Sequence, residues 1–375
     1  MSSHIELSQI IRIHYGAALK EDSRIHSGMH DVFGSSGIIG RHSEALFDYP
    51  SIVIGRKGSV GLVTYAPHGG WAIDTAYFIE RTNPVSCDLR YLYFALQNAD
   101  LSQHTITTSI PGLSRDDIYR TRIYFPALAE QRRIAAILDK ADALRRKRQE
   151  AIALTEQLLR STFLEMFGDP VTNPKRWPTR PLGELIEAVD AGWSANGDAR
   201  PCNDGEWGVL KVSAVSQGFF QRGENKAVTD DLGGRELVCP QRGDLLFSRA
   251  NTRELVGATC IVEQDEPRLF LPDKLWRIKP TDLHSRAEYL KMLLSHPKVR
   301  GLLAKVATGS SGSMLNISKE KLLSTVVPAP PLSAQVRASA AYWRISDLRR
   351  QYQSASNSTE ALFNSLTHRA FTGQL

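Results

Sequence analysis

The sequence contains a long internal repeat. When the chain is shifted by 204 positions, residues 114–167 align with residues 318–371 without a gap. Identical pairs in this alignment include Pro126/Pro330, Leu128/Leu332, Gln131/Gln335, Arg133/Arg337, Leu144/Leu348, Arg145/Arg349, Glu156/Glu360, Leu158/Leu362 and Phe167/Phe371. The preceding parts match more loosely, as in Leu7–Ile11 and Leu182–Ile186. We therefore expect a tandem duplication in which a variable globular unit is followed by a shared segment, twice.

The shared segment has the pattern of a long helix. Residues 129–166 contain neither Gly nor Pro, and Gly168-Asp-Pro170 follows as a stop signal. Steps of four and three residues connect positions 137, 141, 144, 148, 151, 155, 158 and 162, which is the coiled-coil period, and the positions 204 later repeat it. The sequence predicts two helices, each roughly 57 Å long, that pair antiparallel through this stripe. The alternative is that each helix folds back onto its own globular unit. The predicted seam, which could also dock partners, contains Ile137, Leu144, Leu158, Ile345, Leu348 and Leu362.

The sequence pattern of the globular units indicates mixed α+β domains. Short β-rich runs bounded by Gly and Pro, such as 50–54, 71–79, 208–213 and 244–248, accompany helical stretches at 87–98 and 285–294. The predicted fold class is α+β, a tandem repeat of two mixed domains each followed by a long helix. The expected divisions are a first domain at 1–127, a central helical segment at 128–170, a second domain at 171–330 and a C-terminal helical segment at 331–375.

Composition and motifs narrow the function classes. The chain lacks the GxxxxGK[ST] loop, the Asp/Asn-Pro-Pro-aromatic loop of adenine methyltransferases, a nuclease Glu-x-Lys after Pro272-Asp273, HExxH and GxSxG, so we expect no active site. Four scattered cysteines without a CxxC pair predict neither a zinc site nor disulfides, and they fit a reducing cytoplasm. No apolar run approaches the ~18 residues that span a bilayer. A net charge of +6 is compatible with a polyanionic partner.

Two basic turns are candidates for reading DNA. Gly55-Arg-Lys-Gly-Ser-Val-Gly61 follows one strand run, and Phe247-Ser-Arg-Ala-Asn-Thr-Arg-Glu-Leu-Val-Gly257 follows another. Arginine can fork onto a guanine edge and asparagine onto adenine, while glycine allows the backbone to approach a phosphate. A solvated cationic hairpin turn is the competing interpretation, and recurrence in both halves favours the DNA interpretation.

A second pair of loops, 105–114 and 308–318, precedes the shared segments. Their hydroxyl and glycine residues suit phosphate contacts, but Ser114 and Ser318 themselves fit helix N-caps. The run Arg145–Arg148 is expected to be a solvated helix face rather than a phosphate contact. The candidate DNA-binding residues are Arg56, Lys57, Ser59, Thr107, Ser109, Lys211, Arg249, Asn251, Arg253, Ser310, Ser311 and Ser313.

With these motifs the chain resembles the specificity (S) subunit of type I restriction-modification systems. The resemblance rests on Gly55–Gly61, Trp71–Tyr77, Ile110–Ser114, Pro126–Ile134 and the terminal Phe371-Thr-Gly-Gln-Leu; the second copy departs with Ala334 where the first has Glu130. It implies two target-recognition domains, each reading half of a bipartite, asymmetric DNA site. It also implies that the long helices act as spacer and docking surface for two methyltransferase (M) subunits, with restriction (R) subunits joining later. S-adenosylmethionine, ATP and Mg would then act on those partners, with no cofactor on this chain.

Three other functions remain open at this point. A stand-alone methyltransferase or nuclease conflicts with the missing motifs. A coiled-coil scaffold without DNA readout would lack salt-dependent DNA binding. The specificity subunit of a type II enzyme, with a separate methyltransferase-nuclease subunit, differs from the leading hypothesis only on its partner chain.

Overall fold

The computed structural model describes residues 4–25, 27–83, 85–104, 112–309 and 314–375 as two compact units. The first unit comprises residues 1–150 and 353–375, and the second comprises residues 151–352. The long helices α3 (Leu128–Phe167) and α9 (Leu332–Phe371) each contribute one part to either unit. Among the described residues, no helix is both long and apolar enough to cross a membrane.

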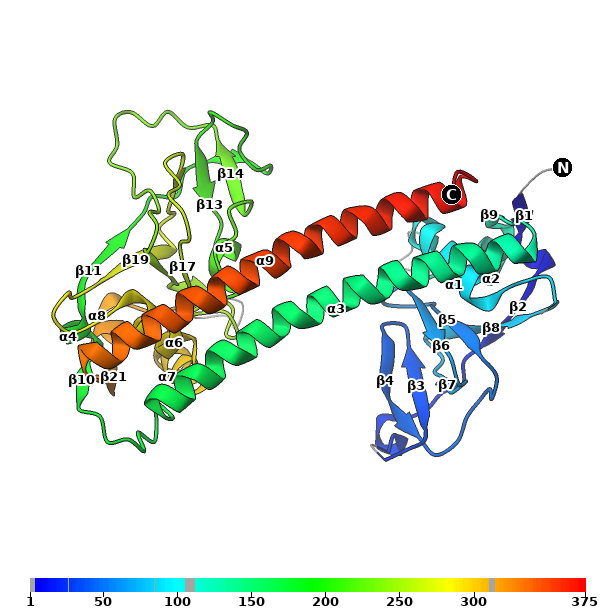
Figure 1. The fold of residues 1–375 in the computed structure, drawn as a ribbon, viewed down its shortest axis with the longest axis horizontal. Coiled ribbons are helices and arrows are strands. Elements are labelled where there is room, and N and C mark those ends of the chain that lie inside the picture. Colours follow the sequence, from blue (N-terminus) through cyan, green and yellow to red (C-terminus); the bar gives the residue numbers. More distant parts are fainter. Residues whose placement is uncertain (1–3, 26, 84, 105–111, 310–313) are drawn as a thin grey trace. The chain divides into compact units, whose positions relative to one another are not determined.

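In its described residues, the first unit contains three small sheets and two short α-helices besides its parts of α3 and α9 (Figure 1). A four-stranded antiparallel sheet has the order β2-β8-β5-β6, and a three-stranded sheet has the order β4-β3-β7. Strand β1 pairs with β9 near the start of α3. The element bounds are β1 His4–Glu6, β2 Ile11–Tyr15, β3 His30–Gly34, β4 Gly37–His42, β5 Ser51–Gly55, β6 Val63–Ala66, β7 Trp71–Ala72, β8 Ala76–Arg81, α1 Leu89–Asn98, α2 Arg115–Arg120 and β9 Arg122–Tyr124.

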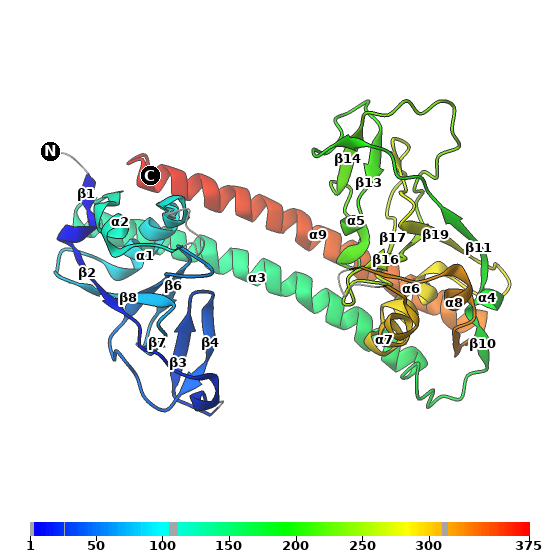
Figure 2. The ribbon, with the colours of Figure 1, turned by 180° about the vertical axis from the view of Figure 1, so that it is seen from behind.

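The second unit repeats this plan with additions (Figure 2). Its antiparallel sheet β11-β19-β15-β17 corresponds to β2-β8-β5-β6, and its sheet β12-β14-β13-β18 contains a parallel pair, as the sheet of β3 and β7 does. The helix α7 has no α-helical counterpart in the first unit among the described residues, whereas the pair β16–β20 corresponds to an isolated bridge between Lys57 and Gly112. The element bounds are β10 Thr179–Pro181, α4 Leu182–Leu185, β11 Ile186–Ala191, β12 Gly197–Asp198, β13 Gly208–Leu210, α5 Ser213–Ser216, β14 Asn225–Val228, β15 Leu245–Ser248, β16 Ala250–Asn251, β17 Thr259–Ile261, β18 Leu269–Phe270, β19 Leu275–Pro280, α6 Ala287–Ser295, α7 Pro297–Val306, β20 Leu315–Asn316, α8 Lys319–Leu323 and β21 Val326–Pro328.

The predicted fold class is confirmed: each unit is α+β, and a long helix follows each globular part. The helical stretches expected at 87–98 and 285–294 are α1 and α6, and the β-rich run at 244–248 contains β15. The expected divisions at 127, 170 and 330 stay predictions, because the compact units divide within α3 and α9 instead.

In its first turn, each long helix carries a buried glutamine that fixes it to its globular part. The Gln131 Nε2 donates to the carbonyls of Ser86 and Pro126, and its Oε1 accepts from the Asp88 N–H. Gln335 makes the same three bonds, to the carbonyls of His284 and Pro330 and from the Arg286 N–H. Both glutamines are fully buried. The repeat identified in the sequence is therefore a repeat of contacts as well.

Both interpretations of the long helices hold in part. In the first unit, Ile134 and Leu138 of α3 share a core with α1 and the sheet, and Phe363 and Phe371 of α9 join the same core. There α3 and α9 run antiparallel, since Arg133 contacts the terminal Leu375 while Arg145 contacts Glu360. In the second unit the core likewise combines residues of both helices with α6 and the sheet. Each helix therefore packs on its partner and on globular parts together.

The buried stripe of each long helix does not pass through the leucines of the predicted seam. At these positions it passes through the next residue along the chain. Leu144, Leu158, Leu348 and Leu362 are 40%, 47%, 37% and 50% exposed, so their placement in a buried seam is wrong, and Ile137 and Ile345 are half-buried. The more buried side chains lie one position later, at Leu138, Arg145, Leu159, Tyr342, Arg349 and Phe363.

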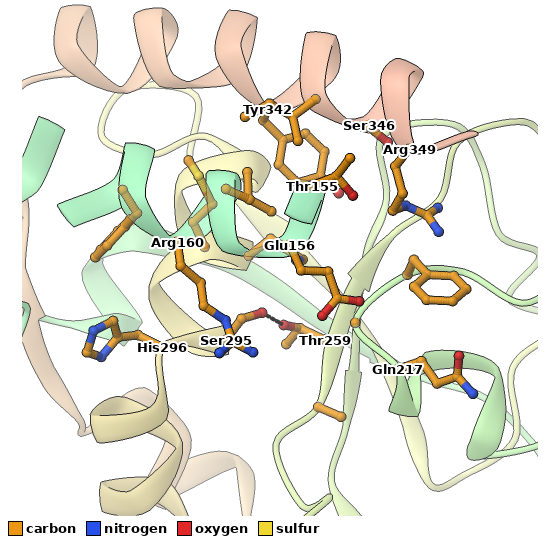
Figure 3. A pocket seen from close by; sticks show the side chains of 18 of the residues that line it. Thr155, Glu156, Arg160, Gln217, Thr259, Ser295, His296, Tyr342, Ser346 and Arg349 are labelled. Carbon is orange, nitrogen blue, oxygen red and sulfur yellow. Dashed lines mark hydrogen bonds between the residues drawn. The ribbon is translucent and has the colours of Figure 1, made fainter. Parts of the chain in front are cut away.

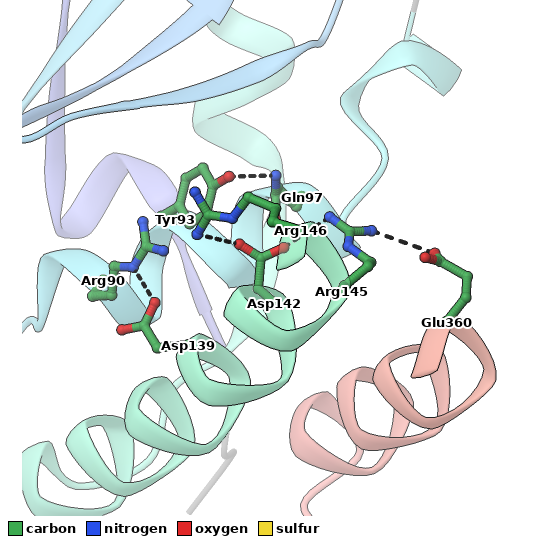
Figure 4. A network of polar contacts seen from close by, with 8 residues as sticks. All are labelled: Arg90, Tyr93, Gln97, Asp139, Asp142, Arg145, Arg146 and Glu360. Carbon is green, nitrogen blue, oxygen red and sulfur yellow. Dashed lines mark hydrogen bonds and ion pairs between the residues drawn. The ribbon is translucent and has the colours of Figure 1, made fainter. Parts of the chain in front are cut away.

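Ion pairs explain how arginine occupies this stripe. Asp142, 5% exposed, accepts from Arg145 and pairs with Arg146, and Arg145 also reaches Glu360 on α9 (Figure 4). The Arg145 guanidinium lies 4.6 Å from the centre of the Phe363 ring. The run Arg145–Arg148, expected to be a solvated face, is exposed at Arg146 and Lys147 but contributes Arg145 to this network.

Candidate nucleic-acid interface

In the first unit, Arg56 is held where β5 ends. Its N–H donates to the Thr75 carbonyl at 2.9 Å, and its own carbonyl accepts from the Leu113 N–H at 3.0 Å. The side-chain Nη1 donates to the Asp74 carbonyl at 3.3 Å, and the guanidinium lies 5.7 Å from the centre of the Tyr77 ring. Two chain segments distant in sequence therefore fix this arginine.

In the second unit, Arg249 has the corresponding contacts where β15 ends. Its N–H donates to the Lys274 carbonyl at 3.1 Å, and its carbonyl accepts from the Ile317 N–H at 2.9 Å. The side-chain Nε donates to the Asp273 carbonyl at 3.0 Å, and the guanidinium lies 5.7 Å from the centre of the Trp276 ring.

We call Arg56 and Arg249 the edge arginines. Strand register explains their equivalence, because Ile54 pairs with Tyr77 and Phe247 pairs with Trp276, each pair two residues before the arginine. Neither edge arginine forms an ion pair with a carboxylate in the part of the chain that the structure describes. The one side-chain hydrogen bond of each uses a single donor of the five that a guanidinium carries. The remaining donors can bind a phosphate or a base edge.

The turn after Arg56 requires glycine. A Cβ on Gly55 would lie 2.1 Å from the Ser59 carbonyl oxygen, and Gly58 and Gly61 both have φ of +79°. This tight path leaves Lys57 and Ser59 exposed. Lys57 also forms an isolated β-bridge with Gly112, which places the basic turn against the end of the second predicted loop.

The second unit brings its two predicted loops together in the same way. Asn251 in β16 pairs with Leu315 in β20, and the Asn251 Oδ1 accepts from the Thr252 N–H. Arg253, two residues after Asn251, is exposed. Lys211 is half-buried after β13, in the other sheet of this unit, and its N–H donates to the Glu224 carbonyl. Lys211 therefore does not share the strand edge that carries Arg249.

The hydroxyl candidates Thr107, Ser109, Ser310, Ser311 and Ser313 lie outside the described residues. The two predicted caps are confirmed. Ser114 Oγ accepts from the Asp117 N–H at the start of α2, and Ser318 Oγ accepts from the Lys321 N–H at the start of α8.

Two side chains beside the first edge arginine were missed in the sequence. Tyr15, 48% exposed at the end of β2, has the Arg56 guanidinium 5.0 Å and the Arg115 guanidinium 4.5 Å from its ring centre. These three residues come from separate segments, so no local pattern could have grouped them. The arrangement offers cations and an aromatic face together, as nucleic-acid-binding surfaces do.

Comparison with known proteins supports this assignment. Residues 3–154 match the family model of the type I restriction modification DNA specificity domain. The chain is 29% identical over 240 residues to the type I restriction enzyme EcoEI specificity subunit of Escherichia coli, covering 61% of this chain and 40% of that protein. It is 24% identical over 166 residues to a putative type I restriction enzyme MjaX specificity subunit of Methanocaldococcus jannaschii, covering 43% of this chain and 37% of that protein.

The matched regions thus span well under two thirds of these relatives. Among solved structures, the type I restriction-modification S subunit from M. genitalium has the same fold, with a TM-score of 0.64 and 14% identity over 98% of this chain and 95% of that one. The resemblance inferred from the motifs is therefore confirmed: residues 3–154 match the type I restriction modification DNA specificity domain, and the two relatives named above are specificity subunits.

Proposed function

We propose that the chain is a non-catalytic DNA-recognition subunit that reads a bipartite, asymmetric site on double-stranded DNA. The observation that carries this proposal is the edge arginine, present in each unit with the same backbone and ring contacts. A side chain fixed by its strand register presents its donors in one direction, as direct readout of a base edge requires. The family match of residues 3–154 supports DNA as the ligand.

The surroundings of the two edge arginines differ, which supports unequal half-sites. Lys57 and Ser59 follow Arg56, whereas Asn251 and Arg253 follow Arg249. Lysine and serine suit phosphates, while asparagine suits adenine. The full site is therefore not a palindrome.

Binding of the full chain to duplex DNA at several salt concentrations tests this function. Affinity should fall steeply with salt, and Lys57→Ala should reduce the salt slope by about one. Arg249→Ala should cost about 1–3 kcal/mol on the preferred sequence. Lys226→Ala, at an exposed lysine of β14, is the matched control. Binding that ignores salt, or equal losses in the control, would refute DNA recognition at these turns.

Partner docking is part of the proposal. Each unit exposes a leucine from both long helices, Leu144 and Leu362 in the first and Leu158 and Leu348 in the second. These pairs recur through the repeat, which supports two methyltransferase (M) subunits binding alike, with restriction (R) subunits added in the cytoplasm. S-adenosylmethionine, ATP and Mg act on those partners. Leu144→Asp with Leu362→Asp should weaken M-subunit binding in pull-down titrations without lowering stability; undiminished binding would contradict this docking surface.

A further inference from the structure

A cavity of about 240 Å³ lies inside the second unit, between the long helices, α6 and the sheet. Figure 3 shows Glu156 and Arg160 of α3, and Tyr342 and Arg349 of α9, around this space, with Thr259 on β17. None of the candidate DNA-binding residues that the structure describes lines it.

Two buried polar side chains line the cavity without a partner. Lys291 is 6% exposed and Tyr342 is 5% exposed. Within the described residues, neither the Lys291 ammonium nor the Tyr342 hydroxyl has a hydrogen-bond or ion-pair partner, and both atoms are accessible from the cavity; the ammonium lies 5.7 Å from the centre of the Tyr342 ring. An ammonium and a hydroxyl that face the cavity without a protein acceptor can both donate to a ligand that supplies one.

The other charges around the cavity favour an anion. Four cationic side chains, Arg160, Lys291, Arg300 and Arg349, face two carboxylates, Glu156 and Glu263. Glu263 is already engaged, since it accepts from Ser346 at 2.6 Å and from Arg349 at 3.2 Å. The cavity therefore has an excess of two positive charges when Lys291 is protonated.

The remaining wall is apolar. Phe163, Met292 and Ala258 are buried side chains that line the cavity, together with the partly buried Leu159. An apolar wall with a few convergent polar groups is the usual make-up of a small-molecule site.

We propose that this cavity binds a small organic anion, whose phosphate or carboxylate accepts from Lys291 and Tyr342 and whose apolar body packs on Phe163 and Met292. Burial lowers the pKa of Lys291 to about 8, so an anion there would hold the lysine in its charged form. No described DNA-binding candidate lines the cavity, although Arg300, which does, donates to the Glu254 carbonyl in the turn after β15. The proposed anion is a ligand distinct from DNA.

Calorimetric titration of the full chain tests the proposal with phenyl phosphate, benzoate and inorganic phosphate as probes. The first two distinguish a phosphate from a carboxylate, and the third lacks the apolar body. We expect saturable binding of phenyl phosphate or benzoate that is weaker for inorganic phosphate. Lys291→Met should weaken it by about 10-fold or more, the size of a hydrogen bond to a charged group.

Two further variants keep the test decisive. Tyr342→Phe removes only the hydroxyl, retains the ring packing and should also weaken binding, which covers the case in which Lys291→Met does not fold. Lys226→Met removes an exposed charge of the same unit and should leave binding unchanged. No saturable binding by the wild type, or equal binding by wild type and Tyr342→Phe, would overturn the proposal. A loss of DNA affinity in Lys291→Met without a change in probe binding would overturn it as well.

Discussion

Replacing Gln335 with leucine should destabilise the second unit strongly. Its side chain is fully buried and makes three hydrogen bonds of 2.9 Å, to the carbonyls of His284 and Pro330 and from the Arg286 N–H. Leucine fills similar space but leaves three backbone groups without this partner, of which the Pro330 carbonyl is buried and the other two are partly buried. At about 1–3 kcal/mol for each group, and allowing for the apolar burial gained, we expect a loss of about 2–5 kcal/mol.

Urea unfolding of the full chain measures this loss. Trp177, Trp193, Trp207, Trp276 and Trp343 belong to the second unit and only Trp71 to the first, so tryptophan fluorescence reports mainly on the unit that is changed. Gln351→Leu, at an exposed glutamine of the same helix and unit, is the matched control. If Gln335→Leu shifted the transition no more than Gln351→Leu does, the buried glutamine would not be an anchor of α9.

Three other changes probe the same account. Leu138→Asp should lower the unfolding free energy by several kcal/mol because it buries a carboxylate without a partner. Leu144→Asp, at an exposed position, should change the melting temperature little. Similar shifts of the two variants in thermal unfolding would contradict the assigned buried stripe. The unfolding free energy of the wild type, relative to that of Lys291→Met, should rise between pH 8 and pH 10.5. Burial lowers the pKa of Lys291 to about 8 in the folded protein, so below pH 8 the folded state holds a buried charge, and this cost disappears as the lysine loses its proton. Urea titrations that gave parallel pH profiles for the two proteins would argue against burial of this charge. Gly55→Ala should weaken DNA binding and stability together, since its Cβ would overlap the Ser59 carbonyl; a fully active variant in a gel shift would show that the turn relaxes easily.

The repeat and its 3.5-residue period were sufficient to predict two long helices and their antiparallel pairing, but not the buried face. Leucines at 144 and 348 suggested one stripe, because hydrophobicity is the main signal in a single sequence. The structure instead places Arg145 and Arg349 there, partly buried against Glu360 and Glu263 and against the rings of Phe363 and Phe219, all from other segments. Such partners are distant in the sequence, so a helical pattern cannot reveal them.

The candidate DNA-reading site could likewise be predicted only in part. Arg56 and Arg249 stood out because each follows a β-rich run in a polar turn. Their contacts with the Asp74 and Asp273 carbonyls depend on the pairing of β5 with β8 and of β15 with β19, a long-range register that local sequence does not fix. Tyr15 joins the first site only through this sheet.

The most direct test of the central claim is the DNA sequence modified by the chain together with its methyltransferase partner. Methylated sites would be sequenced for the wild type, Arg56→Ala and Arg249→Ala, with Arg12→Ala at an exposed position of β2 as control. We predict that Arg56→Ala relaxes one half of a bipartite site, that Arg249→Ala relaxes only the other half, and that Arg12→Ala retains both. If either edge-arginine variant relaxed both halves, or left both unchanged, the two units would not read separate half-sites through these arginines.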